Sequence, residues 1–189
     1  MNLTELLTTC RTYRRFLQKP VPMEVLKAAL DNARTASSAG NAQPLRYVAV
    51  TDPDTVAAIH PLVKWAASLP GDLGKPKEGE FPTAYVAVVK AAGAGPFADV
   101  DLGLAVHALV TTAWEAGVGN CMLGLIDTPA IKALLPIAEE DTLRLVVALG
   151  YPAHESHLVP VTDNLKYRLD EKGDFLVPKR AFEDVVTFV

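Results

Sequence analysis

The sequence predicts a single α/β domain in which helices alternate with the strands of one central sheet. Apolar residues recur at helical spacing in several segments, and short continuous apolar runs, typical of buried strands, lie between them. The chain has 189 residues, half of them hydrophobic, which is enough for one ordinary domain to build a core without disulfide or metal support. We therefore treat residues 1–189 as one domain.

Two helices are expected before the first strand. Asn2 and Glu5 form a capping-box pattern that begins a short helix ending near Cys10. Pro22 begins a second helix, whose apolar residues recur every three or four positions: Val25, Leu26, Ala29, Leu30 and Ala33. Residues 11–16 (RTYRRF) lie between the two helices and form a locally basic segment, with three arginines in five positions.

The next part of the chain predicts strand, helix, loop and strand. Residues 46–51 (RYVAVT) predict a strand, and Asp52 followed by Pro53 predicts the start of a helix that runs through residue 60. Residues 70–82 form a long loop rich in proline, glycine and charge, and such a loop is typical of a mobile rim. Residues 83–90 (TAYVAVVK) predict a buried strand.

The longest predicted helix covers residues 99–116 and ends at Gly117. Its apolar residues form one stripe: Leu102, Val106, Leu109 and Ala113. Residues 121–125 then predict a short strand, and Asp127, Thr128 and Pro129 predict the start of another helix.

The last core strand is expected at residues 143–149 (LRLVVAL). Beyond Pro152 the chain is too polar to form a second core, so we expect it to wrap around a neighbour. Residues 164–169 and 175–177 flank a predicted turn, and a terminal helix is expected to begin near Lys179.

Charge and cysteine content exclude several classes of function. With 18 basic and 22 acidic residues, the net charge of −4 gives no overall field that would attract nucleic acid. No apolar run is long enough for a membrane span, and residues 1–10 lack the basic start of a signal peptide, so we expect a cytoplasmic protein. Cys10 and Cys121 are expected to be free thiols in a reducing compartment.

Two motif-like patterns have the wrong spacing for the ligands they suggest. His154, Glu155 and His157 suggest a metal site, but the two histidines are three positions apart after a turn, whereas a zinc protease helix needs two histidines four apart. We therefore expect a solvated loop and no metal. Gly117 and Gly119 follow a helix rather than a strand, and Met122 stands where a dinucleotide motif needs its third glycine. A Rossmann site is therefore disfavoured.

Four segments together carry a resemblance that none carries alone: RTYRRF, ARTASSAGNAQPLRYVAV, GLAVHALVTTAWEAGVGNCMLG and VALGYPAHE. In order and spacing they resemble the nitroreductase family of FMN-dependent oxidoreductases, over nearly the whole chain. The resemblance implies an α+β, three-layer fold, a central mixed sheet flanked by helices, assembled as an intertwined homodimer with two FMN molecules at the interface.

The resemblance also implies which residues bind FMN. The basic segment holds the flavin through Arg11, Thr12 and Arg14, with Arg14 near the pyrimidine side of the ring, where reduction places negative charge. Cys10 stands where many members carry another arginine. From the partner subunit come Ser38 and Asn41, which we rank above Ser37 and Gln43.

The remaining implied contacts lie near the end of the sheet and in the tail. Met122, Leu123 and Gly124 match residues that run beside the flavin ring. Lys179 and Arg180 match the cations that bind the phosphate, with Arg180 favoured, and Lys166 and Arg168 are alternatives for this role.

The implied activity needs no catalytic side chain, because the flavin carries the chemistry. NAD(P)H would reduce the flavin, and a nitroaromatic, quinone or similar acceptor would then reoxidise it in a ping-pong cycle. The loop at residues 70–82, with Trp65 before it, would rim the acceptor pocket. Flavin fragmentation, dehalogenation and a non-catalytic FMN-binding role remain as alternatives, and the sequence leaves open the physiological acceptor and the choice between NADH and NADPH.

Overall fold

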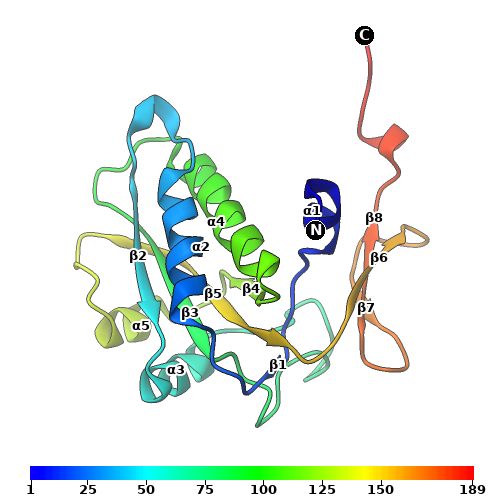
Figure 1. The fold of residues 1–189 in the computed structure, drawn as a ribbon, viewed down its shortest axis with the longest axis horizontal. Helices are drawn as coiled ribbons and strands as arrows, with labels where there is room; N and C mark the ends of the chain where they lie inside the picture. Colours follow the sequence, from blue (N-terminus) through cyan, green and yellow to red (C-terminus); the bar gives the residue numbers. More distant parts are fainter.

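The computed structural model describes residues 1–189 and has three layers, with one sheet between two pairs of helices (Figure 1). The α-helices are α1 (Leu3–Thr9), α2 (Met23–Thr35), α3 (Pro53–Ile59), α4 (Ala98–Glu115) and α5 (Thr128–Leu134). The strands are β1 (Phe16–Leu17), β2 (Leu45–Val50), β3 (Ala84–Lys90), β4 (Gly119–Leu123), β5 (Thr142–Pro152), β6 (Ser156–Pro160), β7 (Arg168–Leu169) and β8 (Phe175–Lys179). Short 3₁₀ turns lie at Ala39–Asn41, His60–Leu62 and Phe182–Asp184.

The main sheet is organised around β5, which is 11 residues long. Its order is β1-β5-β3-β2, and β4 also pairs with β5. Every ladder in this sheet is antiparallel, and a single parallel bridge joins Thr12 to Asn120. The α+β class is therefore confirmed. The α/β class expected from alternation alone is wrong, because neighbouring strands of the main sheet are antiparallel. Even β3 and β4, the parallel strands that α4 connects, are separated by the antiparallel β5.

Alternate residues of the central strands face two separate apolar layers. On β3, Tyr85, Ala87 and Val89 belong to the cluster that includes α3 and α5. The intervening residues of the same strand, among them Val86 and Val88, pack against α2 and α4. Because side chains alternate across a strand and both faces are covered, β3 has the continuous apolar sequence from which a buried strand was expected.

Local capping signals place several helices as predicted. Side-chain oxygens of Asn2, Asp52 and Asp127 accept hydrogen bonds from the backbone N–H three residues later, at 2.9 to 3.1 Å. The stripe predicted in α4 is buried, and Gly117 beyond its end has a positive φ of 75°. No helix has the length and apolar character needed to cross a membrane.

Strands β6, β7 and β8 form a separate three-stranded sheet beside α1, which we call the arm (Figure 1). β6 pairs with β8 in parallel, and β7 pairs with β8 in antiparallel orientation across the predicted turn. The terminal helix expected near Lys179 is wrong, since Lys179 is the last residue of β8 and only a three-residue 3₁₀ turn follows. The final residues extend away from the rest of the chain (Figure 1).

Candidate functional site

The basic segment lies along a cleft of about 280 Å³ formed where α4, β4 and the arm meet. The lining residues come from five parts of the chain: Cys10, Arg11, Thr12, Arg14, His107, Val110, Asn120, Met122, Tyr167, Val177 and Lys179. Five of the predicted cofactor-binding residues are thus brought together from positions far apart in the sequence. His107, Asn120 and Tyr167 line the cleft but were not predicted as site residues, since neither their spacing nor their neighbours in the sequence indicated such a role.

Asn120 attaches the basic segment to β4. Its backbone carbonyl accepts a hydrogen bond of 2.7 Å from the Tyr13 N–H, and its side-chain Nδ2 donates to the Arg11 carbonyl at 3.5 Å. Asn120 is buried, and its hydrogen bonds to Tyr13 and Arg11 fix the path of the basic segment's backbone across β4. Thr12 and Arg14 consequently reach the cleft while Tyr13 between them points into the core.

Arg14 is held against two aromatic rings. The guanidinium carbon lies 4.4 Å from the centroid of the Tyr167 ring and 4.7 Å from that of Phe175. A cation over an aromatic face is attracted by the ring quadrupole, and the contact restricts a side chain that is otherwise flexible. The arm, which carries both rings, therefore orients a cation supplied by the N-terminal part of the chain.

Two more cations line the cleft. Arg11 Nη2 donates to the Leu7 carbonyl near the end of α1 at 2.5 Å, while Arg11 Nε is buried without a hydrogen-bond partner. Lys179 lies at the end of β8 and is exposed. With Arg14, these residues make the cleft suited to an anionic group, and the Tyr167 ring in its lining suits a flat one.

His154 is buried, whereas the sequence predicted a solvated loop position for it. The residue is only 9% exposed, and its ring packs against Tyr13 and Phe175. Burial lowers the pKa of His154 to about 4. Tertiary contacts with the N-terminal segment and with β8 bury this ring, so local sequence gave no signal of it.

The other residues of the rejected metal motif, Glu155 and His157, are exposed and lie near the half-buried Asp174. Glu155, His157 and Asp174 place ligand-type atoms within 4.8 Å of one another. Glu155 is paired with His157 at 3.1 Å, and Asp174 Oδ1 accepts from the Glu155 N–H at 2.7 Å. The Asp174 carboxylate thus binds the backbone of Glu155, and only the side chains of Glu155 and His157 pair with each other.

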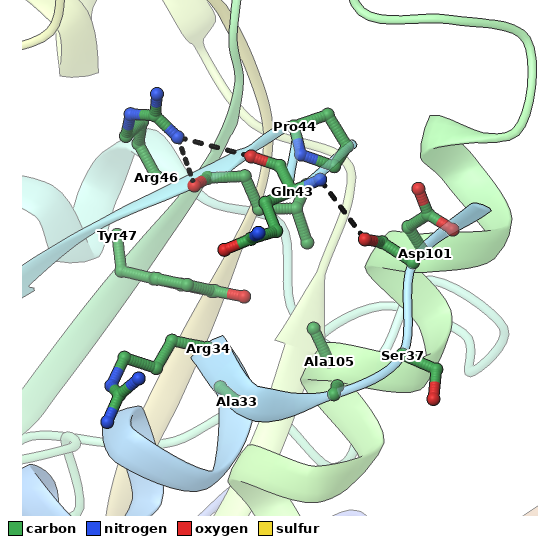
Figure 2. Close-up of a pocket in the computed structure, with 12 residues that line it drawn as sticks. Ala33, Arg34, Ser37, Gln43, Pro44, Arg46, Tyr47, Asp101 and Ala105 are labelled. Carbon is green, nitrogen blue, oxygen red and sulfur yellow. Dashed lines mark hydrogen bonds between the residues drawn. The ribbon is translucent and has the colours of Figure 1, made fainter. Parts of the chain in front are cut away.

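Ser38 lies in a different cavity, of about 210 Å³, between α2, β2 and α4 (Figure 2). Its hydroxyl oxygen accepts from the Gln43 N–H at 3.1 Å. Asn41 is exposed in the same loop, with a positive φ of 55°. None of this cavity's lining residues belongs to the basic cleft, so within one chain Ser38 and Asn41 stand apart from Arg14.

The other predicted residues take several positions. Met122 is 51% exposed and lines the cleft, whereas Leu123 is buried in the core and Gly124 is exposed beyond the strand. Space for a side chain is open at Gly124. Arg180 is exposed but does not line the cleft, and Lys166 and Arg168 are likewise exposed outside the lining.

Trp65 does not rim the cleft. It is 5% exposed and belongs to the core on the α3 side of the sheet, with its ring edge-on to Phe16 at 6.5 Å. The following loop is partly anchored, because Gly74 packs against the Phe175 ring. Trp65 was expected to rim the acceptor pocket together with this loop, but it does not line the cleft.

Comparisons with known proteins agree with this architecture. Residues 7–151 match the family described as the nitroreductase family. The chain is 30% identical to an NADH dehydrogenase of Thermus thermophilus, over 80% of this chain and 88% of that protein. It is 27% identical to an iodotyrosine deiodinase of Thermotoga neapolitana, over 75% and 84%. A Bacteroides fragilis nitroreductase crystallised with FMN shares the fold, with a TM-score of 0.70, 19% identity and 100% coverage of both chains.

Proposed function

The chain belongs to the nitroreductase family, and from this premise we propose that it binds FMN in the basic cleft and passes hydride from NAD(P)H to a nitroaromatic, quinone or similar acceptor. The observation that carries the proposal is the placement of Arg14, whose charge is held over two rings at the edge of the cleft. The similarity to a Thermus thermophilus NADH dehydrogenase and to a nitroreductase crystallised with FMN supports it.

The residues of the cleft fit an anionic, planar cofactor. The unpartnered Nε of Arg11 is a buried donor beside the cleft, and such a donor gains a hydrogen bond when an acceptor binds. We assign Arg11, Thr12 and Lys179 to FMN binding, with Arg14 beside the part of the ring that becomes negative. Bound FMN would supply the hydride chemistry, and the chain would supply position and positive charge.

Met122 and Gly124 are assigned to the edge of the flavin ring. Met122 is exposed into the cleft, and open space at Gly124 lets a ligand approach its backbone. Leu123, buried between them, would act through its backbone. For the phosphate we assign Lys179 together with Arg180, and Lys166 and Arg168 remain alternatives.

We propose that the functional unit is a homodimer. α4 carries a second, exposed apolar row on the side opposite its buried stripe: Phe97 just before the helix, Val100 and Leu104 are 49 to 60% exposed. Exposed apolar rows of this kind are typical of interfaces. In the dimer, Ser38 and Asn41 would complete the flavin site of the partner, which agrees with their separation from Arg14 within one chain.

No side chain is assigned as a nucleophile. Cys121 is buried, and burial raises its pKa to about 11, so its reactive thiolate form is not populated at neutral pH. Met122 and Thr12 offer no acid–base group, whereas His107 and Tyr167 in the same lining carry groups that can transfer a proton.

Reductive deiodination is a second candidate. It is supported by the 27% identity to iodotyrosine deiodinases of Thermotoga neapolitana and Haliscomenobacter hydrossis, over 75 and 79% of this chain. The two candidates share the cofactor and differ in the molecule that reoxidises it.

One experiment separates the candidates. Purified protein is loaded with FMN, and flavin absorbance is followed after adding NADH or NADPH, alone and then with a nitroaromatic, a quinone or 3-iodo-tyrosine. Bleaching by the nicotinamide with turnover on the nitroaromatic or quinone supports the main proposal. For the second candidate, FMN is first reduced with dithionite and 3-iodo-tyrosine is then added; reoxidation of the flavin with release of iodide supports deiodination. A yellow protein that no donor or acceptor changes is a flavin-binding protein without this activity, and a protein that retains no FMN contradicts both.

A further inference from the structure

We propose that His154 is a positioning residue for Arg14, whose backbone it fixes through a neutral imidazole at the edge of the cofactor cleft. His154 does not line the cleft, so it would act through Arg14 and not on the ligand. The proposal rests on the proposed function of the cleft.

Two hydrogen bonds define the state of the imidazole ring. The Arg14 backbone N–H donates to His154 Nε2 at 2.9 Å, and Nδ1 lies 2.8 Å from the Glu155 carbonyl oxygen. A backbone N–H can only donate and a carbonyl oxygen can only accept, so Nε2 carries the lone pair and Nδ1 carries the proton. The contacts therefore select one neutral tautomer. A second proton would sit on Nε2 and face the Arg14 N–H.

The surroundings of the ring favour the same neutral state. His154 packs against Tyr13 and Phe175, with centroids at 5.4 and 4.9 Å. The charged groups that act on it are Arg14 and Arg15, which disfavour protonation, and Asp174, which favours it. Burial outweighs the carboxylate, so the acceptor Nε2 is available throughout the neutral range.

His154 supports Arg14 at both ends of that residue. At the backbone, His154 accepts a hydrogen bond from the Arg14 N–H. The neighbouring Ala153 N–H donates to the Arg15 carbonyl at 2.9 Å, and this bond continues the pairing of β1 with β5. At the side chain, the Phe175 ring that touches His154 also lies under the Arg14 guanidinium. A change at His154 should thus alter the direction in which Arg14 enters the cleft.

Three substitutions distinguish this role from simple core packing. His154→Phe keeps an aromatic ring between Tyr13 and Phe175 and removes both hydrogen bonds. His154→Asn can retain the bond to Glu155 but is too short to replace Nε2. His154→Gln can present its amide oxygen where Nε2 was, so it is the matched rescue variant.

The measurement is the FMN dissociation constant from quenching of flavin fluorescence, for each variant in the parent and in an Arg14→Met background, together with thermal unfolding. We expect His154→Phe and His154→Asn to weaken FMN binding about 5- to 10-fold in the parent, the worth of one neutral hydrogen bond. His154→Gln should recover most of the affinity. In the Arg14→Met background none of the three should weaken FMN further, because a residue that acts only through Arg14 is fully coupled to it.

Two patterns of FMN affinity would show that His154 does not position Arg14. Equal losses in both backgrounds, or a His154→Gln variant as weak as His154→Phe, would make His154 a packing residue. If His154→Phe does not fold, the His154→Asn and His154→Gln pair decides by the same comparison. If the parent itself does not bind FMN, the proposed function fails, whereas binding by the parent that no His154 variant changes overturns the positioning role alone.

Discussion

Gly119 and Gly150 pair with each other across β4 and β5, and each lies beneath an aromatic ring of the N-terminal segment. A Cβ atom added at Gly119 would lie 2.8 Å from the Tyr13 ring, and one at Gly150 would lie 2.9 Å from the ring of Phe16. Without side chains at these two positions, the segment that carries Arg14 can pack directly on the sheet.

Gly150→Ala should therefore destabilise the protein and lower its FMN content together. The new methyl group has no room beside Phe16, and overpacking of this kind costs about 1 to 3 kcal/mol. Denaturant unfolding and the flavin-to-protein absorbance ratio measure the two effects. Gly95→Ala is the control, since nothing lies within 4 Å of its added Cβ. Unchanged stability of Gly150→Ala would show that Phe16 can move freely.

Arg14→Met should weaken FMN binding by about 10- to 100-fold, the loss expected for one charge-assisted hydrogen bond. Methionine can still pack on Tyr167 and Phe175, so the loss reports the charge. Fluorescence titration with FMN gives the affinity. Arg144→Met, which removes an exposed arginine paired with Asp99, should bind FMN like the parent.

Lys179 and Arg180 can be separated by a ligand without phosphate. Because Lys179 lines the cleft, Lys179→Ala should weaken FMN by about 10- to 100-fold and leave riboflavin affinity unchanged. Arg180→Ala tests the sequence-based preference in the same way. If both variants bind FMN normally, Lys166 or Arg168 becomes the candidate. A loss shared by both ligands would indicate a structural role.

Cys121→Ala should retain NAD(P)H-dependent turnover, because the thiol is buried and burial raises its pKa to about 11. A loss of about 1 kcal/mol in the free energy of unfolding is expected for the removed sulfur, by analogy with one buried methylene. Steady-state rates at equal flavin content test the first statement and urea unfolding tests the second. Loss of turnover in a Cys121→Ala variant that still binds FMN would contradict the expectation that this thiol takes no part in the reaction.

His154 should make the fold acid-sensitive. Its pKa is about 4 in the folded chain and 6.5 as the ordinary value, so the unfolded chain binds more protons between these pH values. The free energy of unfolding should then fall by up to about 3 kcal/mol as pH decreases through this window. Urea unfolding at several pH values measures the slope. His154→Phe should show a smaller slope than the parent, and equal slopes would contradict the buried neutral ring.

Elements controlled by local sequence were predictable. The caps at Asp52 and Asp127 and the stripe of α4 are set by residues three or four positions apart, and they were found where expected. The tail is different. Residues 175–177 were expected to flank a turn, and β7 and β8 do pair across it. The helix expected from Lys179 does not form, because pairing with β6 extends β8 to Lys179 and only the short 3₁₀ turn Phe182–Asp184 follows.

The same division holds for the candidate site. Basic character marked Arg11 and Arg14, and family resemblance suggested Met122 and Lys179, which the fold then placed in the same cleft. His154 could not be found this way, since its spacing suggested only a failed metal motif. Its burial depends on rings contributed by Tyr13 and Phe175, and no pattern within a short window encodes such a contact.

The pairing of the N-terminal segment with the end of β5 has a consequence for biosynthesis. Arg14 and His154 are 140 positions apart, and the arm that completes the cleft follows still later in the chain. On a translating ribosome the basic segment emerges before β5 and the arm, the parts of the chain that fix it and close the cleft. Contacts between such distant residues also form slowly, because a long loop must close first. A nascent chain halted before β5 would therefore have no cleft, and capture of the cofactor would require synthesis of the arm.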